Sequence, residues 1–256
     1  MPGPSLVPPR VRWAEHRHPE LAGLVPAATV VIPIGATEQH GDHLPVGTDH
    51  IVIDELATRA ARRATTREEP VLVAPTIPYG ASHHHLPHAG TMSLSAETAL
   101  RVLTELMSSL AVTGCQRIVI LNGHGGNDDI IRQAVRNVCL EHTVLAAAAS
   151  YWTVGGEALR AHSRDDYPVP GHAGAFETSL LLALHPELVS ATPRAGIRVS
   201  LPSPAGTYVE SHRWVDRMGL VSDPAASADA DAGASCIEVL TDALAEVLRE
   251  IALASP

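Results

Sequence analysis

The sequence predicts an α/β protein, a three-layer α/β/α sandwich built around a mainly parallel sheet. Short apolar runs alternate along the chain with longer segments of helical periodicity, which is the pattern of repeated strand–helix units. The 256 residues are 45% hydrophobic but only 3% aromatic, so small and aliphatic side chains must form the core. That composition favours close packing of helices on a sheet. We expect one domain over residues 1–256, with a core at about 28–253.

Charge and composition exclude several classes of function. The formal net charge is −10 and the arginines form no long run, so we expect no nucleic-acid partner. The first residues lack the apolar core of a signal peptide, and we expect no membrane span. Cys115, Cys139 and Cys236 are widely spaced in apolar or helical contexts, which predicts buried thiols in a reducing compartment. These observations predict a soluble, cytoplasmic protein.

The first half of the chain alternates strand and helix. A buried strand is predicted at residues 29–34, and it leads directly into a polar loop. A helix begins near Asp49, because apolar residues then recur at helical spacing and a carboxylate is favoured in the first turn. A second buried strand follows at residues 71–75. Ser95 is a typical N-cap residue and Gly114 a typical C-terminal one, so a helix is expected between them.

The second half continues the alternation. A third strand at residues 117–121 ends in the glycine-rich turn 122–127, and a helix follows it. An alanine-rich fourth strand covers residues 143–150. Segment 202–223 is loop-like, and we interpret it as a flap or a subunit contact. The other predicted helices are residues 13–24, 155–162, 180–184 and 225–253.

Clusters of histidine and carboxylate side chains follow the strands. Glu38, His40 and Asp49 come after the first strand, and His124 lies in the turn after the third. In parallel sheets, sites lie off the carboxyl ends of the strands, so we expect these residues to meet. Glu177, at the start of a later helix, supplies a fifth ligand. Carboxylates beside neutral imidazoles suit Zn²⁺ or Mn²⁺, and five such ligands are about what two divalent ions need to hydrolyse an amide.

The loop at residues 77–91 has a separate interpretation. It is longer and richer in histidine than a simple strand–helix connection requires, so we expect it to line a substrate pocket. Ser82 and His83 are the predicted substrate contacts. The other histidines of this loop are expected to line the pocket rather than to form a third metal site. We expect His43 to hydrogen-bond a metal ligand.

A metal cluster alone leaves two classes of function open. His172 precedes Glu177 at the predicted helix start, and it is the candidate general acid/base that protonates the departing nitrogen of an amide. Without such catalysis, the same ligands would form a structural or sensor metal site. Loss of turnover with retained metal in His172→Ala would indicate catalysis.

Three motifs in this order resemble the creatininase family of binuclear metal amidohydrolases. The motifs are Glu38–Pro45 with Asp49, Asn122–Asn127, and His172–Gly174 with Glu177–Ser179. The resemblance implies a three-layer α/β fold, amide substrates and a homo-oligomer, often a hexamer. It also implies two divalent ions per subunit, Zn²⁺ with Mn²⁺ or Fe²⁺ as alternatives. By motif match it implies the metal ligands Glu38, His40, Asp49 and His124, with His172 as the proton-transfer residue.

Departures from the pattern concern the substrate. Gly125 and Gly126 stand where creatinine hydrolases have Tyr and a metal-binding Glu, which implies that Glu177 takes over as ligand and that the two glycines open a substrate pocket. The Trp-Asp pair that encloses creatinine is missing near Pro168-Val169. Within the family the chain is similar to the mycofactocin-system branch. That similarity implies a peptidase releasing the C-terminal Val-Tyr-derived portion of a modified precursor peptide. The alternative is a small-molecule amidohydrolase, acting on a creatinine-like cyclic amide or as a formamide deformylase.

Overall fold

A four-stranded parallel sheet forms the centre of the computed structural model, which describes residues 9–162, 169–190, 204–207, 209 and 225–256. The strands lie in the order β2-β1-β3-β4. Ile34, Asn122 and Ser150 lie side by side at the carboxyl edge. The strands are β1 (Thr29–Ile34), β2 (Val71–Val73), β3 (Arg117–Asn122) and β4 (Leu145–Ser150).

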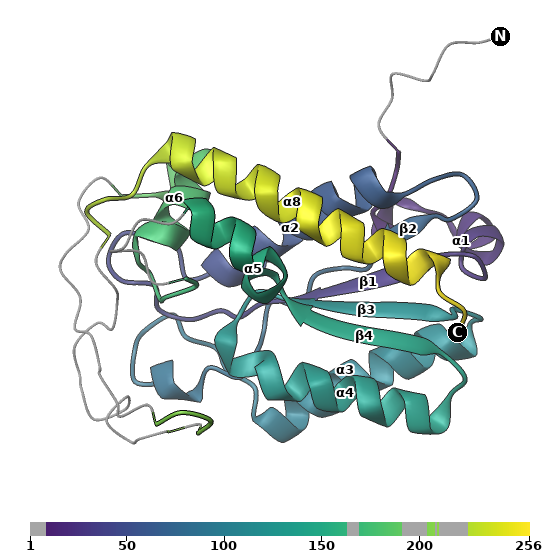
Figure 1. Cartoon of the computed structure of the whole chain (residues 1–256). Coiled ribbons are helices and arrows are strands. Elements are labelled where there is room, and N and C mark those ends of the chain that lie inside the picture. The colour runs from purple at the N-terminus through teal and green to yellow at the C-terminus, as the bar shows by residue number, and fades with distance from the viewer. Residues whose placement is uncertain (1–8, 163–168, 191–203, 208, 210–224) are drawn as a thin grey trace, which may run out of the picture.

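Helices cover both faces of this sheet, which makes three layers and confirms the predicted α/β fold class (Figure 1). One face carries α2 (Thr48–Ala64), α5 (Tyr151–His162), α6 (Ala175–Leu184) and α8 (Ala230–Leu253). The other face carries α3 (Ala96–Val112) and α4 (Asp128–Glu141). The short helix α1 (His18–Leu24) precedes β1, and single 3₁₀ turns lie at Trp13–Glu15, His83–His85, Gly125–Asn127 and Pro186–Leu188.

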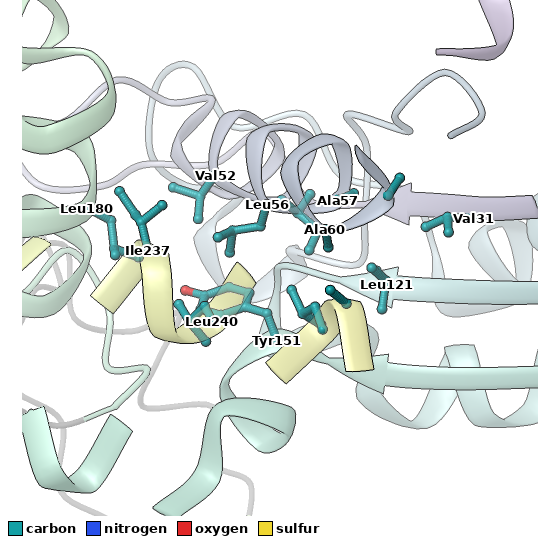
Figure 2. Close-up of a cluster of buried hydrophobic side chains, with 14 of the residues drawn as sticks. Val31, Val52, Leu56, Ala57, Ala60, Leu121, Tyr151, Leu180, Ile237 and Leu240 are labelled. Carbon is teal, nitrogen blue, oxygen red and sulfur yellow. The ribbon is translucent and has the colours of Figure 1, made fainter. Parts of the chain in front are cut away.

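Each face of the sheet has its own hydrophobic core. Successive side chains of β1 point to opposite faces, so Val31 packs with the α2 and α8 side while Val30 and Ile32 pack with α3 and α4. Figure 2 shows the first core, in which side chains of α2 face those of α8 across the ring of Tyr151. Alanines of α2 in this core are fully buried, which is how a chain poor in aromatic residues brings its helices close.

Element ends differ slightly from the predictions. β2 ends at Val73 rather than residue 75. The N–H of Ala74 still donates to the carbonyl of Val31, but Pro33 of β1 has no N–H to continue the ladder. α8 begins at Ala230 rather than 225, since the side chain of Asp229 caps the helix by accepting from the N–H of Ala232. The segment interpreted as a flap, 202–223, lies almost entirely outside the described residues.

The thiols correct one prediction. Cys115 and Cys236 are buried as expected, but Cys139 is exposed. Its position on α4 faces away from the sheet, because the buried positions Ala134 and Val138 define the inner side of that helix. Among the described residues, every helix is too short or too polar to cross a bilayer.

Candidate metal centre and active site

The five predicted ligands meet at the carboxyl edge of the sheet. Glu38 and His40 lie in the loop after β1, Asp49 lies in the first turn of α2, His124 follows β3, and Glu177 lies in the first turn of α6. Their ligand atoms form two groups, each spanning no more than 4.8 Å. The sheet group is Glu38, Asp49 and His124, and the helix group is His40, Asp49 and Glu177. Asp49 belongs to both.

The carboxylates of these groups are buried and incompletely paired. Glu38, Asp49 and Glu177 are at most 5% exposed. Among the described residues, Oε2 of Glu38 and Oδ2 of Asp49 have no hydrogen-bond partner. Burying a carboxylate oxygen without a donor or a cation is costly. The residues present therefore fit a cation held between them.

Backbone carbonyl groups decide which nitrogen of two histidines faces the carboxylates. Nδ1 of His40 lies 3.2 Å from the carbonyl oxygen of Glu38, and Nε2 of His124 lies 3.1 Å from that of Ala81. A carbonyl oxygen only accepts, so in a neutral ring these nitrogens carry the proton. The other nitrogens, Nε2 of His40 and Nδ1 of His124, are therefore left with lone pairs.

Both lone pairs point at Asp49. Nε2 of His40 lies 3.1 Å from Oδ1, and Nδ1 of His124 lies 3.1 Å from Oδ2, the second contact without the alignment of a hydrogen bond. A lone pair and a carboxylate oxygen repel each other unless a proton or a metal ion lies between them. The donor set, nitrogen and carboxylate oxygen, is that of a zinc or manganese site.

Burial and the neighbouring charges of this cluster also shift the pKa values of its ligands. Burial alone would lower the pKa of His40, but Asp49 with Glu177 and Glu38 outweighs it and raises the pKa to about 10. Burial is likewise outweighed at His124, where Glu38 and Asp49 raise the pKa to about 9. Burial raises the pKa of Glu177 to about 8. In the metal-free protein, protons on the imidazoles balance the carboxylates, and a divalent cation would displace those protons.

Two buried asparagines join the loops that carry the ligands. Nδ2 of Asn127 donates to the carbonyl oxygen of Gly35 and to Oδ1 of Asn122, both at 3.1 Å, and its Oδ1 accepts from the N–H of Ala81 at 3.0 Å. Oδ1 of Asn122 also accepts from the N–H of His124 at 3.0 Å. One side chain thus connects the loops that follow β1, β2 and β3.

His172 lies beside the ligands. Its Nδ1 is 3.5 Å from Oε1 of Glu38, and its ring centroid is 4.6 Å from that of His40 and 4.5 Å from that of His85. Burial, with His40 and His85 close by, lowers the pKa of His172 well below its usual range. The ring is therefore neutral at neutral pH and stands next to the candidate metal centre.

The loop after β2 approaches the ligands through Ser82, one of the two predicted contacts, and through His85 rather than His83. Ser82 is buried, and its hydroxyl lies 3.2 Å from Nε2 of His124. His83 is exposed, whereas His85 is buried with its Nε2 3.6 Å from Oε1 of Glu38. Three consecutive histidines give no sequence signal for which ring points inward, because the 3₁₀ turn decides it.

The two glycines after His124 differ in their surroundings. Both are exposed, and a Cβ at Gly125 would meet nothing within 4 Å. A Cβ at Gly126 would overlap with the carbonyl oxygen of Ala81 and lie 2.6 Å from Nε2 of His124. Position 126 therefore has no room for a ligating side chain in this backbone, which agrees with a carboxylate supplied by Glu177 instead.

A backbone N–H of its own segment orients Glu177, and His43 contacts the residue that follows it. The backbone N–H of Ala173 donates to Oε2 of Glu177 at 2.6 Å. Nε2 of His43 lies 2.9 Å from Oγ1 of Thr178. The expectation that His43 hydrogen-bonds a metal ligand is wrong, because the ring reaches the residue that follows the ligand in α6.

The fold is a three-layer α/β sandwich, and the cluster at its carboxyl edge is a candidate metal centre. The family model described as creatininase, creatinine amidohydrolase, matches residues 14–248. The chain therefore belongs to the creatininase family, and it is a hydrolase acting on C–N bonds.

Individual relatives cover nearly the whole chain. The mycofactocin precursor peptide peptidase of Mycobacterium ulcerans is 35% identical over 230 residues, covering 86% of this chain and 85% of that protein. The creatinine amidohydrolase of Pseudomonas putida is 27% identical over 257 residues, covering 93% and 94%. A solved structure described as "Creatininase Mn" has a TM-score of 0.78 at 27% identity, covering 94% of this chain and 98% of that chain. A creatininase variant described as "Zn-Zn type" has a TM-score of 0.77 at 26% identity, covering 93% and 97%.

Proposed function

We propose that this protein is a two-metal peptidase that releases the C-terminal Val-Tyr-derived portion of a modified mycofactocin precursor peptide. The observation that carries the metal part is the membership of Asp49 in both ligand groups. Ions that share a carboxylate lie close together, and two-metal sites act with separations of about 3.5–4 Å. The peptide part rests on the similarity to relatives named for that substrate.

The ligands would hold two divalent ions, Zn²⁺ with Mn²⁺ or Fe²⁺ as alternatives. When bound, such ions supply Lewis acidity toward the amide carbonyl and lower the pKa of water. The side chains of the site contribute in other ways. His172, beside Glu38, exchanges a proton with the departing nitrogen. Ser82, whose hydroxyl lies 3.2 Å from Nε2 of His124, supports that ring.

The surroundings of His124 support an extended substrate. Gly125 and Gly126 are exposed and carry no side chains that would close the approach to the site. A peptide needs such an open approach, whereas a small cyclic amide is better held by enclosing side chains. His83, also exposed, lies in the adjoining loop as a further candidate contact.

A comparison of substrates tests the proposal. The full chain, loaded with zinc or with manganese, is incubated with the modified precursor peptide, its unmodified form, creatinine and a formylated pyrimidine. We expect mass spectrometry to find the released C-terminal portion of the modified peptide only. Turnover of creatinine or of the formamide would instead identify a small-molecule amidohydrolase. A metal-loaded chain that hydrolyses none of the four would indicate a non-catalytic metal protein.

Substitution of His172 tests the catalytic role separately. In His172→Gln we expect kcat to fall by about 10²- to 10⁴-fold, with unchanged metal content, because proton transfer is lost while the ligands remain. Loss of metal in this variant would contradict the assignment.

Two further predictions concern the whole protein. We expect a homo-oligomer, a hexamer, which light scattering tests, and a cytoplasmic location.

A further inference from the structure

The side-chain amide of Gln39 lies between two imidazole rings. Its Oε1 accepts from the backbone N–H of Gly41 at 3.0 Å. This contact fixes the orientation of the amide, because the flipped amide would set its own N–H groups against that backbone N–H. The amide nitrogen therefore faces the rings, with Nε2 lying 3.1 Å from Nδ1 of His85 and 2.9 Å from Nε2 of His172.

We propose that Gln39 is a positioning residue that fixes the tautomers of His85 and His172 and thereby keeps both rings out of the metal-ligand set. An amide nitrogen is a donor only, and its two hydrogens serve one ring each. A neutral imidazole carries a single proton, so each ring must carry it on the nitrogen away from Gln39. That nitrogen is Nε2 in His85 and Nδ1 in His172.

The two protonated nitrogens face the same carboxylate oxygen. Nε2 of His85 lies 3.6 Å and Nδ1 of His172 lies 3.5 Å from Oε1 of Glu38. By distance alone, two further metal groups would exist: Glu38 with His84 and His85, and Glu38 with His40 and His172. A nitrogen that carries a proton has no lone pair for a metal ion. These nitrogens therefore carry an N–H on the side of Glu38 and cannot act as metal ligands.

Hydrogen bonding gives the two pairs of histidines opposite tautomers relative to the carboxylates. His40 and His124 each meet a backbone carbonyl, which takes their N–H and leaves a lone pair toward the carboxylates. His85 and His172 meet an amide N–H, which takes their lone pair and leaves an N–H. Gln39 thus restricts the cluster to the two groups that share Asp49. The catalytic meaning of this sorting rests on the proposed function, but the tautomers themselves are measurable without turnover.

Nitrogen NMR of ¹⁵N-histidine-labelled full chain reads the tautomers directly. Spectra are recorded above neutral pH on the zinc-loaded and the metal-free protein, and the loss of signals in His85→Gln and His172→Gln assigns the two rings. We expect Nδ1–H at His172, which is the less common form of free histidine, and Nε2–H at His85. A wild-type spectrum with Nε2–H at His172 would overturn the proposal, even if the variants at position 39 fail to fold.

Variants at position 39 then test the cause. Gln39→Met removes the donor, and we expect His172 to shift toward Nε2–H. Gln39→Glu replaces the donor by an acceptor of the same shape, and we expect both tautomers to invert. Gln133→Met, an exposed amide on α4 that bonds Asn137, is the matched control and should leave both rings unchanged. An unaltered Nδ1–H at His172 in Gln39→Met would also overturn the proposal.

Zinc titration gives an independent readout. We expect saturating zinc to add a further, weaker ion per chain in Gln39→Met, because His85 then has a lone pair to offer with Glu38 and His84. The wild type should stop at about two ions. Equal zinc uptake by the two proteins would contradict the inference. A wild type that binds no zinc would contradict the proposed function instead, and the tautomers would remain readable in the metal-free protein.

Discussion

The sheet group and the helix group share Asp49 but depend on different parts of the fold. Glu38 and His124 of the sheet group lie on loops that follow β1 and β3 and that Asn127 ties together. Glu177 of the helix group lies on α6, and this helix packs mainly against another helix, α8. The sheet group is thus set mainly by strand register, whereas the helix group joins His40 of the loop after β1 to a carboxylate placed by helix packing. We expect the sheet group to bind its ion more tightly.

Asp49→Asn is expected to have the largest effect, because it removes the ligand common to both groups. A neutral amide bridges two cations poorly, so the zinc content measured by mass spectrometry should fall to near zero and amide hydrolysis to background. Asp129→Asn is the matched control, an exposed acid in the first turn of α4. Retention of both ions in Asp49→Asn would remove the basis for treating the two groups as one centre.

Glu177→Gln separates the two groups. It keeps the shape of the side chain but removes its charge from the helix group, so we expect about one tightly bound zinc per chain to remain. The reciprocal variant Glu38→Gln should leave only the weaker ion of the helix group. Competition with a zinc chelator measures both affinities. The expectation that the sheet group binds zinc more tightly is wrong if the ion that remains in Glu38→Gln has a higher affinity than the ion that remains in Glu177→Gln.

Asn127→Ala tests whether the asparagine network supports the sheet group. The carbonyl of Gly35 and the N–H of Ala81 lose their partner, which should lower the free energy of unfolding by about 1–3 kcal/mol. Zinc affinity of the sheet group should fall by about 10- to 100-fold. Asn137→Ala, on α4, is the control. An equal loss of affinity in the helix group would show that the network does not distinguish the two.

Zinc affinity is expected to rise with pH in both groups. In the metal-free protein the pKa values of His40 and His124 are raised to about 10 and about 9, so protons compete with zinc below those values. The raised pKa values stabilise the metal-free fold fully below the ordinary histidine pKa of about 6.5, and this stabilisation is lost as pH rises through about 9 and 10. The difference in Tm between zinc-loaded and metal-free protein should therefore widen from about pH 6 to pH 9. A constant difference would mean that zinc displaces no protons.

Gly126→Ala should have the smallest effect and acts on the sheet group alone. Its methyl group would overlap with the carbonyl of Ala81 and press on His124, which should cost about 1–3 kcal/mol of unfolding free energy. Gly125→Ala, where nothing lies within 4 Å, should change it by less than about 0.5 kcal/mol. Urea denaturation measures both. Equal effects of the two substitutions would indicate that the backbone of this turn relaxes freely.

Much of the fold could be predicted because its signals are local. The strand at residues 29–34 has the predicted bounds, and Ser95 caps α3 as its residue type suggests. Glu38 and Asp49 were identifiable because both fall within one loop and the helix turn that follows it. Such features depend on neighbours in sequence, which a single chain displays directly.

Other features of the site depend on contacts between distant segments. Gln39 matters through His85 and His172, and neither partner is signalled by the residues around position 39. The inward position of His85, rather than His83, follows from a 3₁₀ turn within a run of identical residues. The tight space at Gly126 exists only because another loop brings a carbonyl against it. Sequence pattern therefore identifies the candidate ligands but not the side chains that orient them.

An ion in the helix group would also act as a cross-link. His40 and Asp49 belong to the first quarter of the chain, whereas Glu177 lies well beyond its midpoint. Unfolding separates such distant residues and destroys the site, so the ion binds only the folded chain and shifts the folding equilibrium toward it. Metal supply would then govern how much of this protein survives in the cell, and scarcity would lower its abundance as well as its activity.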